Sequence, residues 1–294
     1  MLRIKLLHPH RTEELFTGDI SMVNKSIGFV KEFARLFTGK NITRSSAALS
    51  YYLTMTIFPL IICLYTMLGN SYSKAMRILS FAEKFMAVET ARSIEDFLLY
   101  VASNNSNAMM VAGLTVLVTS ASAACRSLQA TIGDMQGGQR FQGLFGFVFS
   151  IIFSLLFLAA LYFAVVVMLT GRTVINKVNE LLPFVDISNS WNWLRFIVLF
   201  AILFVIIWGV YEISKRSGDN YHTFGGAILA TIASVAVCVV FSIIISESAK
   251  YPLVYGSLAS IILLMFWLYT CCLMIYCGAV FNITIRNVKS REAE

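Results

Sequence analysis

Residues Phe224 to Ile245 read FGGAILATIASVAVCVVFSIII, and this run of 22 residues contains no charged side chain. An α-helix needs about 20 mostly apolar residues to cross the hydrocarbon core of a bilayer, so this run is long enough to span a membrane. Further runs meet the same criterion: Ala47 to Leu68, Met109 to Ile132, Leu144 to Thr170, Trp193 to Tyr211 and Val254 to Ile283. The sequence therefore predicts an all-α, polytopic bundle of six transmembrane helices.

The composition of the 294-residue chain agrees with an integral membrane protein. Hydrophobic residues make up 58% of the chain, charged residues make up 13%, and the mean hydropathy is +0.75. A soluble domain carries about 25% charged residues, so these values exclude a soluble fold. No long Pro/Gly/Ser-rich linker divides the chain, which favours one membrane domain rather than two.

The net charge of +7 follows the positive-inside rule, and this distribution argues against a nucleic-acid partner. With the N-terminus in the cytoplasm, fifteen of the 23 lysines and arginines fall on the cytoplasmic side of the predicted spans. The remaining eight fall outside: Lys74, Arg77, Lys84, Arg92, Arg172, Lys177, Arg195 and Lys250. We therefore expect both termini in the cytoplasm, with the excess positive charge facing anionic lipid headgroups.

Three regions follow from this topology. Residues 1–44 form a cytoplasmic N-terminal segment, residues 45–285 form the six-helix transmembrane domain, and residues 286–294 form a cytoplasmic tail. Apolar side chains recur at three- and four-residue spacing from Ile20 to Phe37, which predicts an amphipathic helix in the membrane interface. The external loop over residues 70–107 mixes apolar and charged residues, and we expect it to form one or two amphipathic helices.

Arg126 lies in the second predicted span, where burying a charge costs at least about 2.5 kcal/mol at the bilayer centre. Four polar residues spaced by three, four and three positions share one face of this helix: Thr119, Ser122, Arg126 and Gln129. This stripe should face protein or water rather than lipid. Two interpretations stay open: Arg126 lines a substrate path, or it extends its charge to the inner headgroups.

The first predicted span is a second candidate. Ser46, Ser50 and Thr54 recur every four residues, and Tyr51 adds a further hydroxyl. Pro59 removes one backbone hydrogen bond and can kink or break the helix, which would expose a carbonyl near the middle of the membrane. Broken helices at this depth often border substrate sites in transporters. Small residues serve close helix packing at least as often, so both interpretations stay open.

Tyr255, Gly256 and Ser257 lie at the outer start of the last predicted span. A glycine there permits close backbone contact or a bend near the outer face. Together with the polar stripe of the second span and the hydroxyl-rich first span, these residues complete the candidate substrate path.

The cysteines and histidines form no recognisable metal or catalytic motif. All six cysteines lie in apolar runs without a CxxC pair, and we expect them to be packing residues. His8 and His10 lie in the N-terminal segment and His222 at a membrane edge, whereas a metal-dependent nuclease needs clustered ligands. No Walker A sequence is present. The sequence therefore predicts neither an enzyme nor a cofactor.

Short motifs along the chain resemble the YihY/BrkB family of bacterial inner-membrane proteins. They are RSSAALSYY at 44–52, FPL at 58–60, SAS at 120–122, RSLQ at 126–129, GGA at 225–227, YGSLA at 255–259, WLY at 267–269 and GA at 278–279. Their order and spacing carry the resemblance, which covers roughly Gly28 to Asn287. The resemblance implies a location in the bacterial plasma membrane and suggests links to envelope integrity and to lipid or solute export.

The chain departs from the family pattern at two positions. Val280 stands where the family usually has an acidic residue, and no proline follows Tyr211 at the end of the fourth span. A mechanism that requires a carboxylate at position 280 is therefore in doubt for this chain. The family is often labelled ribonuclease BN-like, but the residues present do not support that label.

We predict a transporter or flippase for an amphiphilic, anionic envelope substrate, with membrane lipids as partners. The alternative is a non-transporting membrane scaffold that organises envelope enzymes. A cavity lined by the first and second spans would favour transport, whereas a dry, fully packed bundle would favour the scaffold. The sequence leaves the oligomeric state open, with a homo-oligomer as one alternative.

Overall fold

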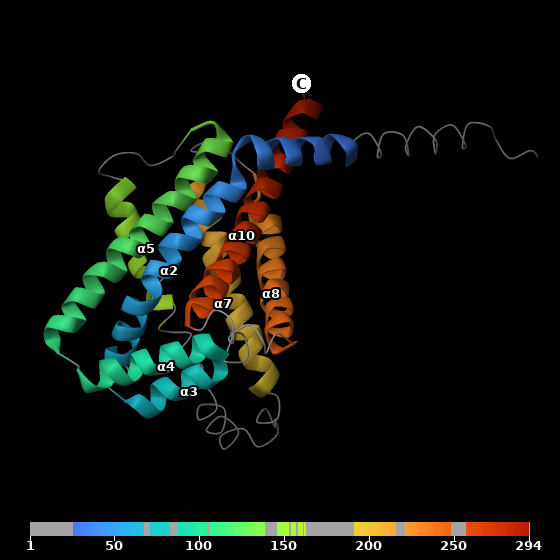
Figure 1. The fold of residues 1–294 in the computed structure, drawn as a ribbon. Coiled ribbons are helices and arrows are strands. Elements are labelled where there is room, and N and C mark those ends of the chain that lie inside the picture. The colour runs from blue at the N-terminus through green and yellow to red at the C-terminus, as the bar shows by residue number, and fades with distance from the viewer. Residues whose placement is uncertain are drawn as a thin grey trace, which may run out of the picture.

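The computed structural model is a bundle of α-helices (Figure 1). It describes residues 26–67, 71–82, 88–104, 106–138, 146–162 without 153, 157 and 161, 191–215, 221–247 and 257–293. Every regular element in these ranges is an α-helix. The labelled helices are α2 (Ile42–Met67), α3 (Tyr72–Ala82), α4 (Val88–Ser103), α5 (Asn107–Gln136), α7 (Trp191–Ser214), α8 (Phe224–Glu247) and α10 (Ser257–Ala293). A helix over 26–39 precedes them, and Gly146–Ala160 form a shorter apolar helix between α5 and α7.

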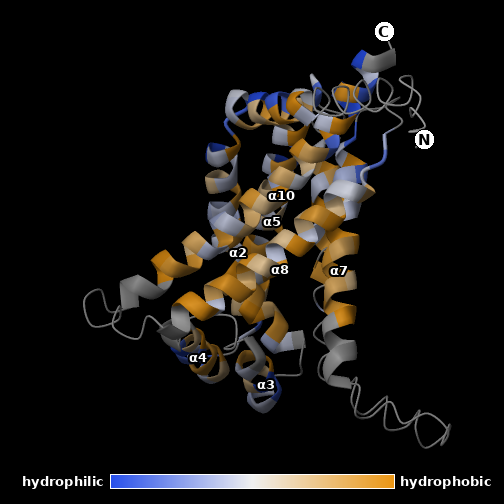
Figure 2. Cartoon of the chain, turned by 90° about the vertical axis from the view of Figure 1, so that its right-hand side faces the viewer, coloured by the Kyte–Doolittle hydropathy of each residue, from blue (hydrophilic) through white to orange (hydrophobic). Residues whose placement is uncertain are grey.

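Five of these helices, α2, α5, α7, α8 and α10, are long and apolar enough to cross a membrane. They correspond to five of the six predicted spans, and the prediction of an all-α membrane bundle is confirmed. The third predicted span, Leu144 to Thr170, lies partly outside the described residues and contains helix 146–160. Figure 2 shows hydrophobic residues along the lengths of α7 and α8 and hydrophilic residues concentrated towards the ends of the bundle.

The bundle has two distinct ends. Helix 26–39 and the C-terminal part of α10 lie at one end, which we call the terminal end, and α3 and α4 lie across the other, the α3–α4 end (Figure 1). α2 and α8 run from the terminal end to the α3–α4 end, and α5, α7 and α10 run back (Figures 1 and 2). The segment predicted to hold one or two external amphipathic helices, residues 70–107, contains α3 and α4.

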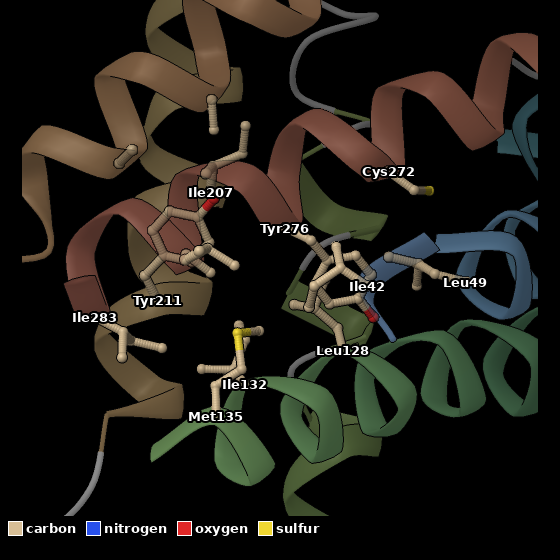
Figure 3. Packing of buried hydrophobic residues seen from close by; sticks show 14 of the residues in the cluster. Ile42, Leu49, Leu128, Ile132, Met135, Ile207, Tyr211, Cys272, Tyr276 and Ile283 are labelled. Atoms are coloured by element: carbon tan, nitrogen blue, oxygen red, sulfur yellow. The ribbon is translucent and has the colours of Figure 1, made fainter. Parts of the chain in front are cut away.

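The main apolar core lies where α2, α5, α7 and α10 converge (Figure 3). Ile42 from α2, Leu128 from α5 and Tyr276 from α10 lie against one another there. Ile42 and Tyr276 are completely buried. A second, smaller cluster buries Leu79 and Leu98, so that α3 and α4 pack against each other and against the end of α2.

Helix 26–39 packs on the bundle through a face that is not the apolar stripe noted in the sequence. Glu32 and Leu36 are 3% and 4% exposed and pack towards α10, whereas Ile27 and Val30 of the predicted apolar stripe are 47% and 64% exposed. Phe29 supports the buried face through an edge-to-face contact with Phe281 of α10, at 5.6 Å between ring centres. Of the predicted stripe, Ile27 and Val30 are therefore exposed, Phe37 packs against the core, and the part before residue 26 lies outside the described residues.

The contact between α8 and α10, which we call the α8–α10 seam, is made by backbone atoms. A Cβ atom at Gly226 would overlap the Gly278 carbonyl oxygen and the Asn282 amide, and one at Gly278 would lie 2.7 Å from the Ala230 Cβ. The Asn282 side chain accepts a hydrogen bond from the Gly226 N–H at 2.7 Å and donates one to the Thr223 carbonyl at 2.8 Å. Glycines at facing positions let two helices approach this closely in membranes.

Candidate functional site

A cavity of about 150 Å³ lies inside the bundle, between α2, α5, helix 146–160, α7 and α10. Leucine, isoleucine and alanine side chains form most of its wall, among them Leu53, Ala121 and Ile207. The two hydroxyl groups in the wall are bonded to their own helices: Thr56 donates to the Leu53 carbonyl at 2.6 Å and Ser154 to the Ser150 carbonyl at 2.7 Å. This apolar lining favours apolar groups.

Arg126 joins α5 to helix 146–160 beside this cavity. Its Nη1 donates to the Ser122 hydroxyl at 2.5 Å and to the Ser150 hydroxyl at 3.2 Å. The two hydroxyl oxygens lie 2.8 Å apart, and both serines are buried. The guanidinium carbon also lies 4.9 Å from the centre of the Phe147 ring, which is a cation–π contact.

The positive charge of Arg126 is not neutralised within the described part of the chain. The ion pairs found there join Glu32 to Arg35 and Arg291 and Glu212 to Lys215, and none involves Arg126. A guanidinium carries five N–H donors, of which the serines engage only those on Nη1. The remaining edge of the planar fork can bind a carboxylate or phosphate in a bidentate manner.

The cavity and the Arg126 guanidinium involve the same two helices, although Arg126 itself does not line the cavity. Cys125, adjacent to Arg126 on α5, lines the cavity, and so does Ser154, one turn from Ser150 on helix 146–160. The two helices therefore carry an apolar space and, on a different face of α5, a cation whose Nε and Nη2 donors are unused among the described residues. This arrangement is suited to a molecule that has both an apolar part and an anionic group.

The structure brings together only part of the polar stripe predicted on the second span. Ser122 and Arg126 are in direct contact, and the arginine side chain reaches back along α5 rather than towards the terminal end. Thr119 is exposed and donates to the Thr115 and Val116 carbonyls of its own helix, at 2.9 and 3.0 Å. Gln129 is half-buried and does not line the cavity.

The polar residues predicted on the first span do not line the cavity. Ser46, Ser50 and Thr54 each donate to a carbonyl of α2 itself, at 2.8, 2.9 and 2.8 Å, while Tyr51 is exposed. α2 continues as one helix through Pro59, so the proline does not divide the span. The face of α2 that reaches the cavity consists instead of Leu49, Leu53, Thr56 and Leu60.

The third group of predicted residues lies mostly outside the described part of the chain. Tyr255 and Gly256 are not among the described residues, and Ser257 is described only as the first residue of α10. The structure also identifies residues that sequence analysis missed, chiefly Ser150 and Ser154 on helix 146–160. Their four-residue spacing in an apolar run was an available signal for a polar helix face.

Comparisons with known proteins give a consistent picture. The family model of the virulence factor BrkB matches residues 33–294. The chain is 23% identical to a ribonuclease-like protein, YfkH of Bacillus subtilis (strain 168), over 274 residues that cover 91% of this chain and 98% of that protein. It is 29% identical to a UPF0761 membrane protein of Alteromonas mediterranea over 99 residues, 33% of this chain and 32% of the relative. No solved structure matches the chain.

Proposed function

Because this chain belongs to the BrkB virulence factor family and is an integral membrane protein, we propose that it moves an amphiphilic, anionic envelope molecule across the membrane. One observation carries the proposal: α5 and helix 146–160 border an apolar cavity and also hold Arg126, whose charge is not neutralised among the described residues. The apolar part of the substrate enters the cavity, and its anionic group binds the free edge of the guanidinium.

The dimensions of the cavity limit what it holds. A volume of about 150 Å³ accepts a short segment of an acyl or prenyl chain rather than a whole lipid tail. Each buried CH₂ group stabilises the complex by about 0.8 kcal/mol, so a few such groups give useful affinity. The rest of a longer chain would remain in the surrounding lipid.

Transport is tested with purified protein in liposomes that contain phosphatidylglycerol labelled on a short acyl chain. The rate of label movement between leaflets is measured with a quencher that does not cross the membrane. Arg126→Ala removes a charge-assisted contact worth about 1.5–3 kcal/mol, so we expect the rate to fall at least tenfold. Arg126→Lys should retain part of the activity, because the charge survives without the fork.

The matched controls separate the transporter from the alternative scaffold. Ala121→Phe fills the cavity and should also stop transport, whereas Thr119→Val on the same helix changes an exposed hydroxyl bonded to its own backbone and should have no effect. A well-folded Arg126→Ala protein that transports normally contradicts the proposal. The scaffold is the better account if the unmodified protein moves no label and cells that carry Ala121→Phe keep an intact envelope.

We propose further that the chain lies in the bacterial plasma membrane with both termini in the cytoplasm. α5 finishes at the terminal end and α7 begins at the α3–α4 end, so the chain between them crosses the bundle, which supports six crossings (Figures 1 and 2). Basic residues at the terminal end, including Lys40, Arg44 and Arg286, agree with the positive-inside rule.

Labelling of single introduced cysteines in intact cells tests this topology. Ser103, at the end of α4, and Ser290, in the last turns of α10, are both exposed. An impermeant thiol reagent should label a cysteine at position 103 and not one at position 290. The reverse result contradicts the orientation.

We also propose that the protein has no nuclease activity, so RNA incubated with the purified protein should stay intact.

A further inference from the structure

A second pocket, of about 400 Å³, opens at the terminal end of the bundle. It lies between the turn after helix 26–39, the first turn of α2 and the last turns of α5. Lys40, Ser45, Thr131 and Asp134 contribute polar side chains to its wall. Its volume is in the range of small-molecule sites, and its polar wall contrasts with the apolar cavity deeper in the bundle.

Two left-handed residues give this pocket its shape. Asn41 has a φ of 50° and turns the chain from helix 26–39 into α2. Gly137 has a φ of 82° and ends α5, where the Gly138 N–H closes the turn on the Gly133 carbonyl at 3.0 Å. Asparagine and glycine are the residues that adopt this conformation most readily, so the two turns are stable features of the pocket wall.

Two opposite charges on the pocket wall, Lys40 and Asp134, are both exposed to solvent and form no ion pair with each other. In the part of the chain that the structure describes, neither Lys40 nor Asp134 forms an ion pair or a side-chain hydrogen bond, with each other or with another residue. The Ser45 hydroxyl on the same wall also has no partner among these residues. A ligand with a cationic and an anionic group would satisfy both charges at once.

The position of the pocket indicates where such a ligand comes from. α2 begins its candidate span at Ile42 and α5 ends its own at Gln136, so the pocket lies at the end of two candidate spans, the side from which a lipid headgroup would reach it. On α2, Ser45 of the pocket is one turn from Leu49 of the apolar cavity, and on α5 Thr131 is one turn from Leu128. Ile42, Leu128 and Tyr276 pack against one another where these helices meet (Figure 3).

We propose that this pocket binds a zwitterionic phosphoethanolamine headgroup. The phosphate binds the Lys40 ammonium and the Ser45 hydroxyl, and the ligand ammonium binds the Asp134 carboxylate. An anionic headgroup such as phosphoglycerol gains the contact with Lys40 but is repelled by Asp134, so the pocket discriminates against it. The site is separate from the Arg126 site and would serve a scaffold as well as a transporter, because it requires binding and not transport.

Binding is measured on the full-length protein in detergent micelles, by native mass spectrometry and by thermal unfolding. The added ligands are short-chain phosphatidylethanolamine, short-chain phosphatidylglycerol and free phosphoethanolamine. We expect phosphatidylethanolamine to bind about fivefold more tightly than phosphatidylglycerol, the effect of one partly exposed charge pair. Asp134→Asn should abolish this preference, Asp134→Glu should keep it, and Lys40→Gln should weaken the binding of both lipids.

The control is Asp96→Asn, which removes the same charge from an exposed position on α4 at the opposite end. It should leave the preference for phosphatidylethanolamine unchanged.

Because the side chains of Lys40 and Asp134 have no partners among the described residues, their variants should unfold at the temperature of the unmodified protein when no lipid is added. Protection by free phosphoethanolamine equal to that by the lipid assigns the site to a soluble ligand, and protection by the lipid alone assigns it to the membrane. An unchanged lipid preference in Asp134→Asn, or equal binding of both lipids by the unmodified protein, overturns the proposal.

Discussion

At the α8–α10 seam, Gly226 and Gly278 bring two backbones into contact, whereas α2 and α5 border a cavity with side chains such as Leu53 and Leu117. The first contact is locked by Asn282, whose amide bonds both to the Gly226 N–H and to the Thr223 carbonyl. At the α2–α5 side, Arg126 donates to Ser122 of α5 itself and to Ser150 of helix 146–160, and so makes no polar contact with α2.

The difference shows how one bundle can be both firm and adaptable. Backbone contacts and buried amide bonds at the α8–α10 seam leave no side chain that can move aside, so this pair behaves as a fixed support. The α2–α5 pair is packed as extensively, but through side chains such as Leu53 and Leu117, which can yield by a change of rotamer where a backbone atom cannot. The candidate site lies on the adaptable side, and the following variants test that distinction.

The largest effect is expected from Gly226→Ala at the α8–α10 seam. The added methyl group overlaps the Gly278 carbonyl oxygen, a backbone atom that cannot shift without displacing α10. Overpacking of this kind costs about 3 kcal/mol. Thermal unfolding in detergent measures the loss. Gly225→Ala is the matched control, because its Cβ would only meet a Phe281 ring carbon at 3.8 Å. Equal stability of the two variants would show that the seam is not tightly packed.

The second largest effect is expected from Asn282→Ala. The change leaves the Gly226 N–H and the Thr223 carbonyl without their partner, and Asn282 is only 3% exposed. Leaving buried polar groups unsatisfied costs about 1–3 kcal/mol, so we expect a loss near 2 kcal/mol in the same unfolding assay. Asn104→Ala, an exposed position after α4, provides the comparison and should be nearly neutral. A loss no greater than that of Asn104→Ala would contradict the role given to this amide.

A smaller effect is expected where helix 26–39 meets the end of α10. Burial alone raises the pKa of Glu32, but hydrogen bonds from Arg35 and Asn287, with the charges of Arg35 and Arg291, outweigh it and hold the pKa below 4.5. The ionised Glu32 therefore stabilises the docked helix at neutral pH. This stabilisation is lost as the pH falls below 4.5 through the lowered pKa of the folded protein.

Glu32→Gln should weaken this docking by about 1 kcal/mol at neutral pH, since the amide keeps only part of the hydrogen bonding. Hydrogen exchange of the helix backbone measures the docking. Exchange should speed up in the unmodified protein as the pH falls below 4.5, after correction for the intrinsic rate, and Glu32→Gln should lack this response. An identical pH response in both proteins would exclude Glu32 as its source. The α8–α10 seam should stay protected in each case.

The smallest effect is expected from Gly113→Ala on α5. Its Cβ would lie 3.2 Å from the Ile62 Cγ2 of α2, a side-chain atom that can yield by a few tenths of an ångström. We expect a change within about 0.5 kcal/mol. The comparison with Gly226→Ala is direct, since the chemical change is the same. A loss as large as at Gly226 would mean that the two helix pairs are equally rigid.

The parts of the fold that depend on one helix at a time were predictable from the sequence. Apolar runs such as Phe224 to Ile245 define α8 and four other long helices, because span length is set by the bilayer. Helical periodicity also placed Ser122 next to Arg126 correctly. Helical periodicity could not predict the contact between Arg126 and Ser150, because these residues are 24 positions apart on two different helices.

Two features of the structure depend on hydrogen-bond partners that the sequence pattern does not reveal. The hydroxyls of Ser46, Ser50 and Thr54 bond to their own backbone, so a polar stripe in a span need not signal a polar cavity. The burial of Glu32 has no signal in the local sequence either, because Asn287 and Arg291, more than 250 positions away, satisfy its carboxylate. Partners so distant in sequence leave no local pattern.

The length of α10 has a mechanical consequence. Its 37 residues make a rod about 55 Å long, against a hydrocarbon core of about 30 Å. Glu32 bonds helix 26–39 to Asn287 and Arg291 near the C-terminal end of α10. These bonds fix the position of helix 26–39 along the α10 axis. A membrane that thins or thickens must therefore deform around the protein or strain these bonds. The connection makes the tilt and depth of the whole bundle sensitive to the thickness of the membrane that contains it.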